Sequence, residues 1–290
     1  MGKLERILNR ADSFKEAGRF EDALRELKKA LKIAPQDPDV YLLFALTYDS
    51  MEKFETSVFY FRKAIELCPM DSYAWTQLGI TLARMGRHKH AFDSFHKALT
   101  IDPIYIEAKW NLALTYRSVG CYEDAIAEFQ KCMELDFDSD YIKEEIHYQL
   151  GLCYYDMGWT KEALDEFRIH VSIFPNDLWA LHSMGNCYSD LGWIDEAIDK
   201  YEQIINSYPE FIPAYNSLAF SMTEKGWYDE ALEVLRTALE ISPDDESIKD
   251  NMDYIQSLKD DEDGSKGIIL FNLLIQILNR KQTQKNTIHP

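Results

Sequence analysis

Residues 72–105 read SYAWTQLGITLARMGRHKHAFDSFHKALTIDPIY, and this stretch decides the fold because most of the chain repeats its pattern. Within it, Leu78 and Leu82 lie four residues apart, on one face of a first helix. Gly86 then supplies the left-handed conformation that a helix end favours, and Pro103 ends a second apolar run. The stretch therefore predicts two helices joined by a tight turn.

A period of 34 residues runs through most of the chain. Prolines at this spacing close the units at Pro35, Pro69, Pro103, Pro175, Pro209 and Pro243. Counted from Leu4, the eighth position is always small: Ala11, Ala45, Gly79, Ala113, Gly151, Gly185 and Ala219. The twentieth position is also small: Ala23, Ser57, Ala91, Ala125, Ala163, Ala197 and Ala231. The twenty-fourth position is bulky: Leu27, Phe61, Phe95, Phe129, Phe167, Tyr201 and Leu235. The pattern predicts paired helices that touch where a small residue faces a large side chain.

Turn and cap residues recur at the same period. Glycine occupies the fifteenth position of every unit except the second, which has Glu52: Gly18, Gly86, Gly120, Gly158, Gly192 and Gly226. Aspartates stand where the next helix needs an N-cap: Asp37, Asp71, Asp177 and Asp245. Each unit therefore has its own signals for ending one helix and starting another.

These residues resemble the tetratricopeptide repeat family from Leu4 to Pro243. The matching units begin at Leu4, Pro38, Ser72, Ile106, Glu144, Leu178 and Ile212. The resemblance implies an all-α, right-handed superhelical solenoid of seven helix-turn-helix repeats over residues 4–259, in which 246–259 form a polar-backed capping helix. Between the fourth and fifth units Phe137 replaces the proline and four extra residues fall within 138–143, so we expect a longer or bent connection there.

Composition excludes several classes of function. Asp and Glu outnumber Lys and Arg by 50 to 31, and the net charge of −19 would repel a nucleic acid backbone. The five cysteines form no Cys-x-x-Cys pair, and the charged N-terminal residues do not resemble a secretory signal, so we expect a reduced, cytoplasmic protein.

No catalytic or cofactor motif stands out in the sequence. A phosphate-binding glycine loop, a nucleophile elbow and a His-Glu-x-x-His motif are all missing, so we expect no enzyme activity and no cofactor. His88, His90 and His96 lie close together, but Arg87 and Lys89 beside them disfavour a cation. We therefore favour a solvated turn over a metal site.

The resemblance also implies a binding surface, because tetratricopeptide repeats line a concave groove with positions two, five, nine, twelve and thirteen of their first helices. Positions two, five, nine and twelve centre about 130° from the core stripe, yet many of them are apolar in this chain. The predicted groove residues are Leu42, Leu46, Tyr73, Ile80, Arg84, Trp110, Leu114, Arg117, Tyr148, Leu152, Tyr155, Trp179 and Phe220. Part of this area is expected to pack on the adjacent repeat, and the remainder predicts a binding site.

The groove residues indicate the kind of partner. Relatives that clamp the acidic tails of chaperones have Lys at position five, and no unit here does. Arg84 and Arg117 among apolar side chains instead suit an apolar or amphipathic segment that carries an occasional acidic residue. We therefore expect a scaffold or adaptor that binds a protein or peptide, mainly through repeats two to five. The alternative is a peripheral membrane-associated assembly factor attached through its C-terminal segment.

Three tryptophans form a second candidate surface. Trp159, Trp193 and Trp227 occupy the sixteenth position of successive units, directly after the turn glycine. Each ring could cover the end of its own helix pair, which we favour, or the three together could form an exposed contact surface.

The C-terminal region has a different composition. Residues 260–265 predict an acidic hinge, 266–281 an apolar helix and 282–290 a disordered tail. After Asp263 the chain has no acidic residue and four basic ones, namely Lys266, Arg280, Lys281 and Lys285. An apolar helix with basic ends predicts one of three locations: the chain's own groove, a second copy of the chain, or weak contact with an anionic membrane.

Overall fold

The computed structural model of the chain describes residues 2–135 and 140–260, and all regular secondary structure in these ranges is helical. The predicted all-α fold class is therefore confirmed. The apolar helix predicted at 266–281 and the tail predicted at 282–290 lie outside the described residues, as does most of the predicted hinge at 260–265. The right-handed superhelical course of the whole array stays a prediction.

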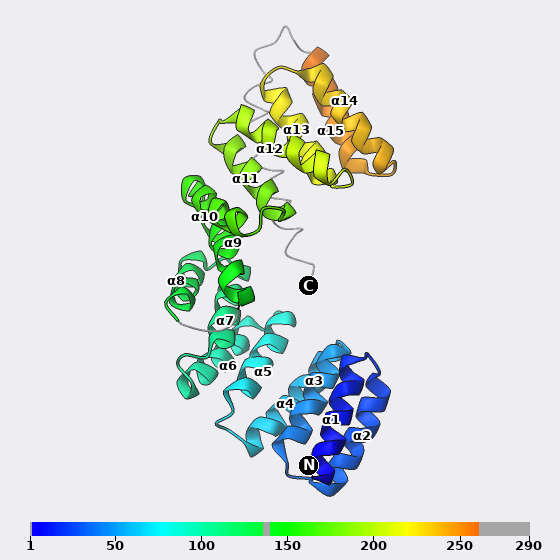
Figure 1. Cartoon of the computed structure of the whole chain (residues 1–290), viewed down its shortest axis with the longest axis vertical. Helices are drawn as coiled ribbons and strands as arrows, with labels where there is room; N and C mark the ends of the chain where they lie inside the picture. Colours follow the sequence, from blue (N-terminus) through cyan, green and yellow to red (C-terminus); the bar gives the residue numbers. More distant parts are fainter. Residues whose placement is uncertain (1, 136–139, 261–290) are drawn as a thin grey trace. The chain divides into compact units, whose positions relative to one another are not determined.

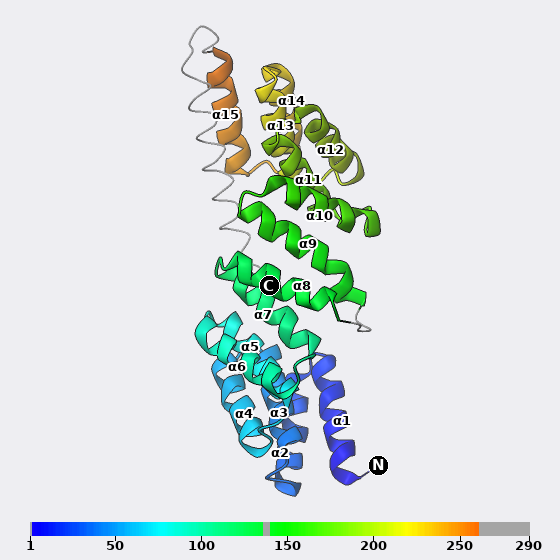
Figure 2. The same cartoon turned by 90° about the vertical axis from the view of Figure 1, so that its left-hand side faces the viewer.

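The chain divides into two compact units after Ser139. The first unit contains α1 (Lys3–Glu16), α2 (Phe20–Ile33), α3 (Pro38–Ser50), α4 (Phe54–Leu67), α5 (Ser72–Arg84), α6 (His88–Ile101), α7 (Ile106–Ser118) and α8 (Tyr122–Met133). The second unit contains α9 (Asp140–Asp156), α10 (Thr160–Ile173), α11 (Leu178–Asp190), α12 (Ile194–Ser207), α13 (Ile212–Glu224), α14 (Tyr228–Ile241) and α15 (Glu246–Asp260). Figures 1 and 2 show these helices in chain order.

Consecutive helices pack in pairs, from α1 with α2 to α13 with α14. Within each unit the second helix of a pair also packs against the first helix of the next pair. First helices approach one another more closely than second helices do, as α1 and α3 or α11 and α13 illustrate. The first helices therefore line the inner side of each unit, where the groove was expected.

The contact between paired helices is the one that the alternation of small and large residues predicts. A Cβ atom added to Gly79 would lie 2.6 Å from Cε1 of Phe95, and one added to Gly185 would lie 2.5 Å from Cε1 of Tyr201. Phe95 and Tyr201 are almost completely buried. Two helices approach this closely only because one of them lacks a side chain at the crossing point.

The turns and caps also follow the sequence signals. All six turn glycines have positive φ angles, and Glu52 takes the same left-handed conformation with φ of 57°. The side chains of Asp37, Asp71 and Asp177 accept hydrogen bonds from backbone N–H groups at the starts of α3, α5 and α11. Asp245 accepts from Ser247 and Ile248 in the same way, at the start of α15.

The junction between the fourth and fifth helix pairs is described only in part. Residues 136–139 lie outside the described residues, but 140–143 belong to α9 and do not form a loop. They add an N-terminal turn, so α9 has 17 residues where α11 and α13 have 13. The predicted longer or bent connection within 138–143 is therefore tested only at 140–143, which continue the helix, and the rest of it lies outside the described residues.

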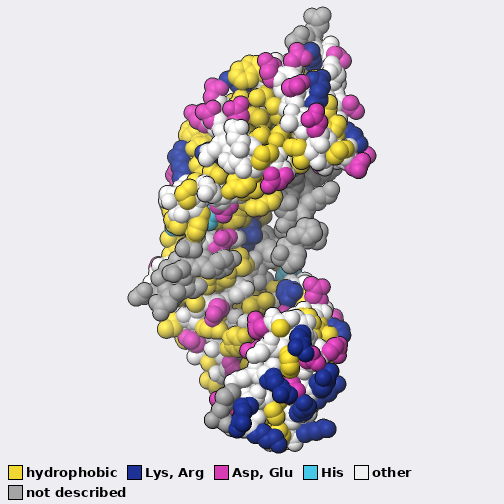
Figure 3. Space-filling view, turned by 45° about the vertical axis from the view of Figure 1, so that its right-hand side comes forward, with side chains coloured by type: hydrophobic (Ala, Val, Ile, Leu, Met, Phe, Trp, Pro, Cys, Tyr) yellow, Lys and Arg dark blue, Asp and Glu magenta, His cyan; other side chains and the backbone are white. Residues whose placement is uncertain are grey.

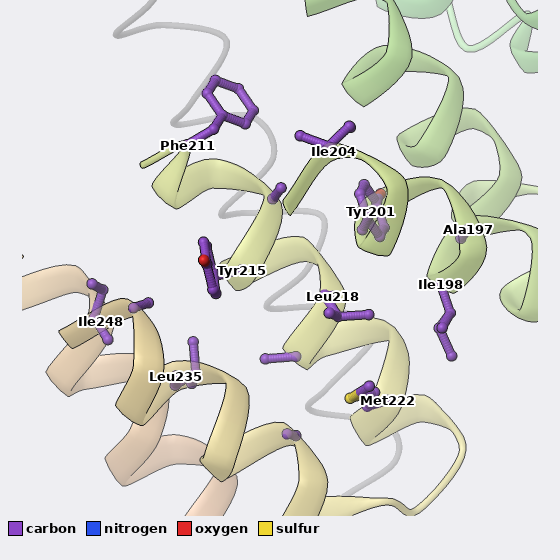
Figure 4. Packing of buried hydrophobic residues seen from close by; sticks show 14 of the residues in the cluster. Ala197, Ile198, Tyr201, Ile204, Phe211, Tyr215, Leu218, Met222, Leu235 and Ile248 are labelled. Carbon is purple, nitrogen blue, oxygen red and sulfur yellow. The ribbon is translucent and has the colours of Figure 1, made fainter. Parts of the chain in front are cut away.

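The second unit has a continuous core that ends at α15. Tyr201 of α12, Leu218 of α13 and Leu235 of α14 are buried in one cluster, which Figure 4 shows. Ile248 and Ile255 of α15 are completely buried against the same cluster, while the opposite face of α15 is polar and exposed. This arrangement covers the last helix pair, because α15 occupies the place of a further first helix.

Replacing Gly79 with Ala is expected to lower the free energy of unfolding by about 1–3 kcal/mol, because the added Cβ forces the Phe95 ring to move. Urea denaturation followed by circular dichroism measures the effect. Gly2→Ala is the control, since a Cβ there meets no atom within 4 Å. Equal denaturation midpoints for the two variants would show that the helix contact is wrongly placed.

Replacing Glu52 with Gly is expected to raise the free energy of unfolding by about 0.5–1 kcal/mol. The gain from removing left-handed strain at a residue with a Cβ exceeds the extra conformational entropy that Gly has in the unfolded chain. Lys53→Gly is the control, because Lys53 has φ of −88° and gains no relief. A decrease in stability on Glu52→Gly would contradict the strain at this turn.

Candidate peptide-binding site

All the groove residues predicted from the sequence lie on first helices. In the first unit they are Leu42 and Leu46 on α3, Tyr73, Ile80 and Arg84 on α5, and Trp110, Leu114 and Arg117 on α7. In the second unit they are Tyr148, Leu152 and Tyr155 on α9, Trp179 on α11 and Phe220 on α13. The structure thus brings them together as two sets, one in each unit.

Exposure separates these residues into groups. Tyr73 and Trp179 keep 38% and 48% of their surface exposed, and the Arg84 side chain is also exposed. The remaining residues except Trp110 are partly buried: Leu42, Leu46, Ile80, Leu114, Arg117, Tyr148, Leu152, Tyr155 and Phe220. A partner segment could therefore contact the two exposed rings and the outer atoms of the partly buried residues.

Trp110 does not face the groove. Its side chain is only 6% exposed, and its ring packs edge-on against Phe129 of α8 with centroids 5.2 Å apart. The expectation that Trp110 lies outside the paired-helix core is therefore wrong. Because Ala113 leaves the Phe129 ring uncovered on one side, the long indole of Trp110 reaches over and covers it.

The same packing recurs at the fifth position of the next two units. Tyr148 lies 5.8 Å from the Phe167 ring, and His182 lies 5.7 Å from the Tyr201 ring. His182 is buried, and this burial lowers its pKa to about 4. Large rings at this position therefore belong mainly to the core of their own pair and contribute little to binding.

The two groove arginines of the first unit differ in their partners. Nη1 of Arg84 lies 2.5 Å from Oδ2 of Asp49, and its guanidinium group stacks 4.6 Å above the Phe54 ring. Arg117 forms no ion pair with any residue described, and its Nε atom is buried without a hydrogen-bond partner. The charge of Arg84 is thus already neutralised, whereas Arg117 can still bind an acidic group.

Two first helices of the second unit carry only acidic charge. On α11 and α13 the charged residues are Asp190 and Glu224, and neither helix contains Lys or Arg. Burial raises the pKa of Asp190, although the hydrogen bond from Tyr155 acts against this shift. Burial also raises the pKa of Glu224, and the nearby charge of Asp190 raises it further. The two carboxylates are therefore close enough to repel each other.

Asp190 and Glu224 are missing from the groove residues that the sequence predicts. The signal that could have found them is their shared thirteenth position, 34 residues apart, on helices without basic residues. Two polar contacts involve the same helices: the Tyr201 hydroxyl donates to Oδ1 of Asn186 on α11 at 2.7 Å, and Nε2 of His182 on α11 lies 3.0 Å from Oγ of Ser217 on α13. In Figure 3 the dark blue Lys and Arg side chains gather mainly over the N-terminal repeats, at the bottom of the view.

The three tryptophans of the second candidate surface are about half exposed. Trp159, Trp193 and Trp227 keep 49%, 42% and 41% of their surface exposed and precede α10, α12 and α14. The Trp159 ring stacks on Tyr154 at 5.8 Å, and the Trp193 ring lies 6.0 Å from Tyr188. Each of these two rings covers the end of its own helix pair on one side. A contact role for the other side stays a prediction.

Two other kinds of site are missing from the part of the chain that the structure describes. It contains no cluster of three or more His, Cys, Asp or Glu side chains that could hold a metal ion. Its helices include none that is long and apolar enough to cross a membrane.

Comparison with protein families identifies the chain. The tetratricopeptide repeat model matches residues 38–70, 72–105, 106–139, 144–176 and 212–245, and a second model of this repeat matches 179–210. A further TPR repeat model matches residues 11–51. The chain therefore belongs to the tetratricopeptide repeat family. Proteins of this family are scaffolds for protein–protein interaction.

Solved structures with the same fold include three informative cases. The C-terminal part of a TPR repeat-containing protein from Cytophaga hutchinsonii has 17% identity and a TM-score of 0.68, covering 84% of this chain and 99% of that one. YrrB, described as a TPR protein with an unusual peptide-binding site, has 24% identity, a TM-score of 0.53, and coverage of 65% and 94%. The APC/C hetero-tetramer Cut9–Hcn1 has 18% identity, a TM-score of 0.61, and coverage of 84% and 48%, so this chain spans about half of that matched chain. No curated protein sequence matches significantly.

Replacing Trp110 with Ala is expected to lower the free energy of unfolding by about 3–5 kcal/mol, because the indole is buried against Phe129. Urea denaturation measures the effect. Phe59→Ala on α4 is the control, since Phe59 is 55% exposed and its loss should change stability by about 1 kcal/mol or less. Similar decreases in the free energy of unfolding for the two variants would show that Trp110 is not part of the core and faces the groove.

Proposed function

We propose that the chain is an adaptor whose first helices bind an apolar or amphipathic segment of another protein. The first unit carries the main contact, through the exposed ring of Tyr73 and the outer atoms of Leu46, Ile80 and Leu114. Trp110 is left out of this surface because it is buried. Tyr148 contributes little because its ring packs mainly in the core of its own pair, and the other members of the predicted groove keep the role that the sequence suggests for them.

The observation that carries the proposal is the guanidinium group of Arg117, which pairs with no carboxylate in the described ranges and whose Nε atom is buried without a hydrogen-bond partner. A cation that is partly buried and lacks an ion-pair partner in the described ranges is costly unless a ligand supplies the missing acceptor. A carboxylate can satisfy Arg117 with two parallel hydrogen bonds, which fixes the register of the bound segment. The partner is therefore an apolar segment with one acidic side chain placed to meet Arg117.

The C-terminal segment is the second element of the proposal. Residues 266–281 are apolar with basic ends, and such a segment can compete for a groove, join two copies of the chain or attach to an anionic membrane. An adaptor regulated by this segment suits the acidic inner face of the second unit. The alternative function is a peripheral membrane-associated assembly factor, and a cytoplasmic location stays a prediction in both cases.

Selection of helical peptides from a random library against the full-length chain tests the adaptor function. The bound peptides are expected to share apolar residues at helical spacing and one acidic residue. Tyr73→Ala combined with Arg117→Glu is expected to weaken their binding at least about tenfold, the effect of losing one charge-assisted contact. Fluorescence anisotropy of a labelled peptide measures the dissociation constant.

The matched control changes an aromatic residue and an arginine on a second helix of the first unit. Phe59→Ala with Arg62→Glu alters an exposed ring and an exposed arginine of α4, and should leave peptide affinity unchanged. Equal affinities for both double variants would contradict the groove of the first unit. Flotation of the intact chain with anionic vesicles, lost when residues 264–290 are removed, would favour the membrane-associated alternative.

A further inference from the structure

The face formed by α11, α13 and α15 has negative charge that no described residue neutralises. Asp190 and Glu224 occupy equivalent positions near the C-terminal ends of α11 and α13. Asp190 accepts a hydrogen bond from the neutral Tyr155 hydroxyl, and neither carboxylate forms an ion pair with a described cation. Because these two exposed carboxylates stand at the same position of neighbouring helices in contact, they favour a ligand that brings positive charge.

Apolar side chains lie on the same face. Trp179, at the N-terminal end of α11, is 48% exposed and is held edge-on against Phe211 with ring centroids 5.0 Å apart. Phe220 of α13 and Leu258 of α15 are partly buried. Because the Trp179 ring is already oriented by its neighbour, covering it costs little side-chain entropy. The face is therefore suited to a segment that is both apolar and basic.

One segment of this chain has that composition. Residues 266–281 read KGIILFNLLIQILNRK, with basic residues at both ends and nine apolar residues of Ile, Leu and Phe between them. The chain contains no acidic residue after Asp263, so nothing in this segment would be repelled by Asp190 and Glu224. Its charge and its apolar character both complement the face.

The end of α15 places this segment within reach. Lys259 of α15 pairs with Asp229, as Lys225 pairs with Asp195 one repeat earlier. Since both partners are shifted by 34 residues, α15 lies parallel to α13 and ends at the edge where Glu224 lies. The five residues 261–265 can span up to roughly 17 Å when extended. This exceeds the roughly 8–10 Å between packed helices, so Lys266 can reach Glu224.

We propose that residues 266–281 bind the face of α11, α13 and α15 in the same molecule, with Lys266 against Asp190 and Glu224 and the apolar side chains that follow over Phe220 and Trp179. The short connection raises the local concentration of the segment far above that of a second copy. This inference rests on the proposed adaptor function, because the bound segment would cover the part of the partner-binding surface in the second unit.

Limited digestion of the full-length chain with trypsin tests this contact, with cleavage after Arg280 and Lys281 followed by mass spectrometry. Asp190→Asn combined with Glu224→Gln removes both charges and keeps the side-chain shapes. Cleavage at the two sites is expected to become about tenfold faster in this variant, because the segment is released more often. Circular dichroism verifies that the helix content is unchanged.

The control removes two carboxylates from the second helices of the same unit. Asp165→Asn with Glu233→Gln changes side chains that are 73% and 74% exposed on α10 and α14, and should leave the cleavage rate at its wild-type value. Hydrogen exchange of the amides of residues 266–281 gives an independent measurement, with protection expected in the wild type and lost in the Asp190→Asn and Glu224→Gln variant.

Several outcomes would overturn the proposal. Equal cleavage rates in all three proteins would show that the segment does not use these carboxylates. Protection that disappears on dilution, with a dimer in light scattering, would assign the contact to a second copy. Protection that requires anionic vesicles would assign it to a membrane. The peptide affinity that depends on Tyr73 and Arg117 is measured separately, so failure of the proposed adaptor function is distinguishable from failure of this contact.

Discussion

The close approach of a small residue to a large side chain within each helix pair is the constraint on which the structure depends. At Gly79, Gly151 and Gly185 the space for a Cβ atom is occupied by the ring of Phe95, Phe167 or Tyr201. This contact sets the distance and the register of the paired helices. Because each pair is built in the same way, the next first helix meets an equivalent surface, and contacts such as Lys225 to Asp195 recur one repeat later as Lys259 to Asp229.

The same contact determines how much of the inner face remains available for binding. Where the residue opposite a bulky ring is small, part of the ring would remain exposed. The fifth-position side chains of Trp110, Tyr148 and His182 pack against these rings and bury them. Apolar residues on the first helices therefore divide between completing the core and facing solvent. In the first unit Tyr73 and Arg117 are among the residues that reach solvent. They supply an aromatic ring and a positive charge to this surface.

Charge then distinguishes the inner faces of the two units. In the first unit Arg84 is neutralised by Asp49, while Arg117 has no ion-pair partner among the residues described. In the second unit α11 and α13 contribute only carboxylates. On the proposed function, one repeat template thus carries two surfaces that would favour ligands of opposite charge. A regulated adaptor could use this difference, because a basic segment on the second unit would cover only the part of the partner-binding surface that lies there and would leave Arg117 available to an acidic group.

The sequence by itself determined the helix pairs, their small-to-large contacts, the turns and the caps. Each of these depends on residues that are near in the chain or that repeat at a fixed period. The contact between Gly79 and Phe95 can therefore be predicted from the sequence alone. Only the tertiary structure decided which groove residues face outward. A helical wheel predicts only the direction in which the Trp110 side chain leaves the helix. The long indole then packs into the space beside Ala113 and against Phe129. The partners of Arg84, Arg117 and Asp190 were likewise decided by packing, because an ion pair between residues such as Asp49 and Arg84 depends on how neighbouring repeats stack in space.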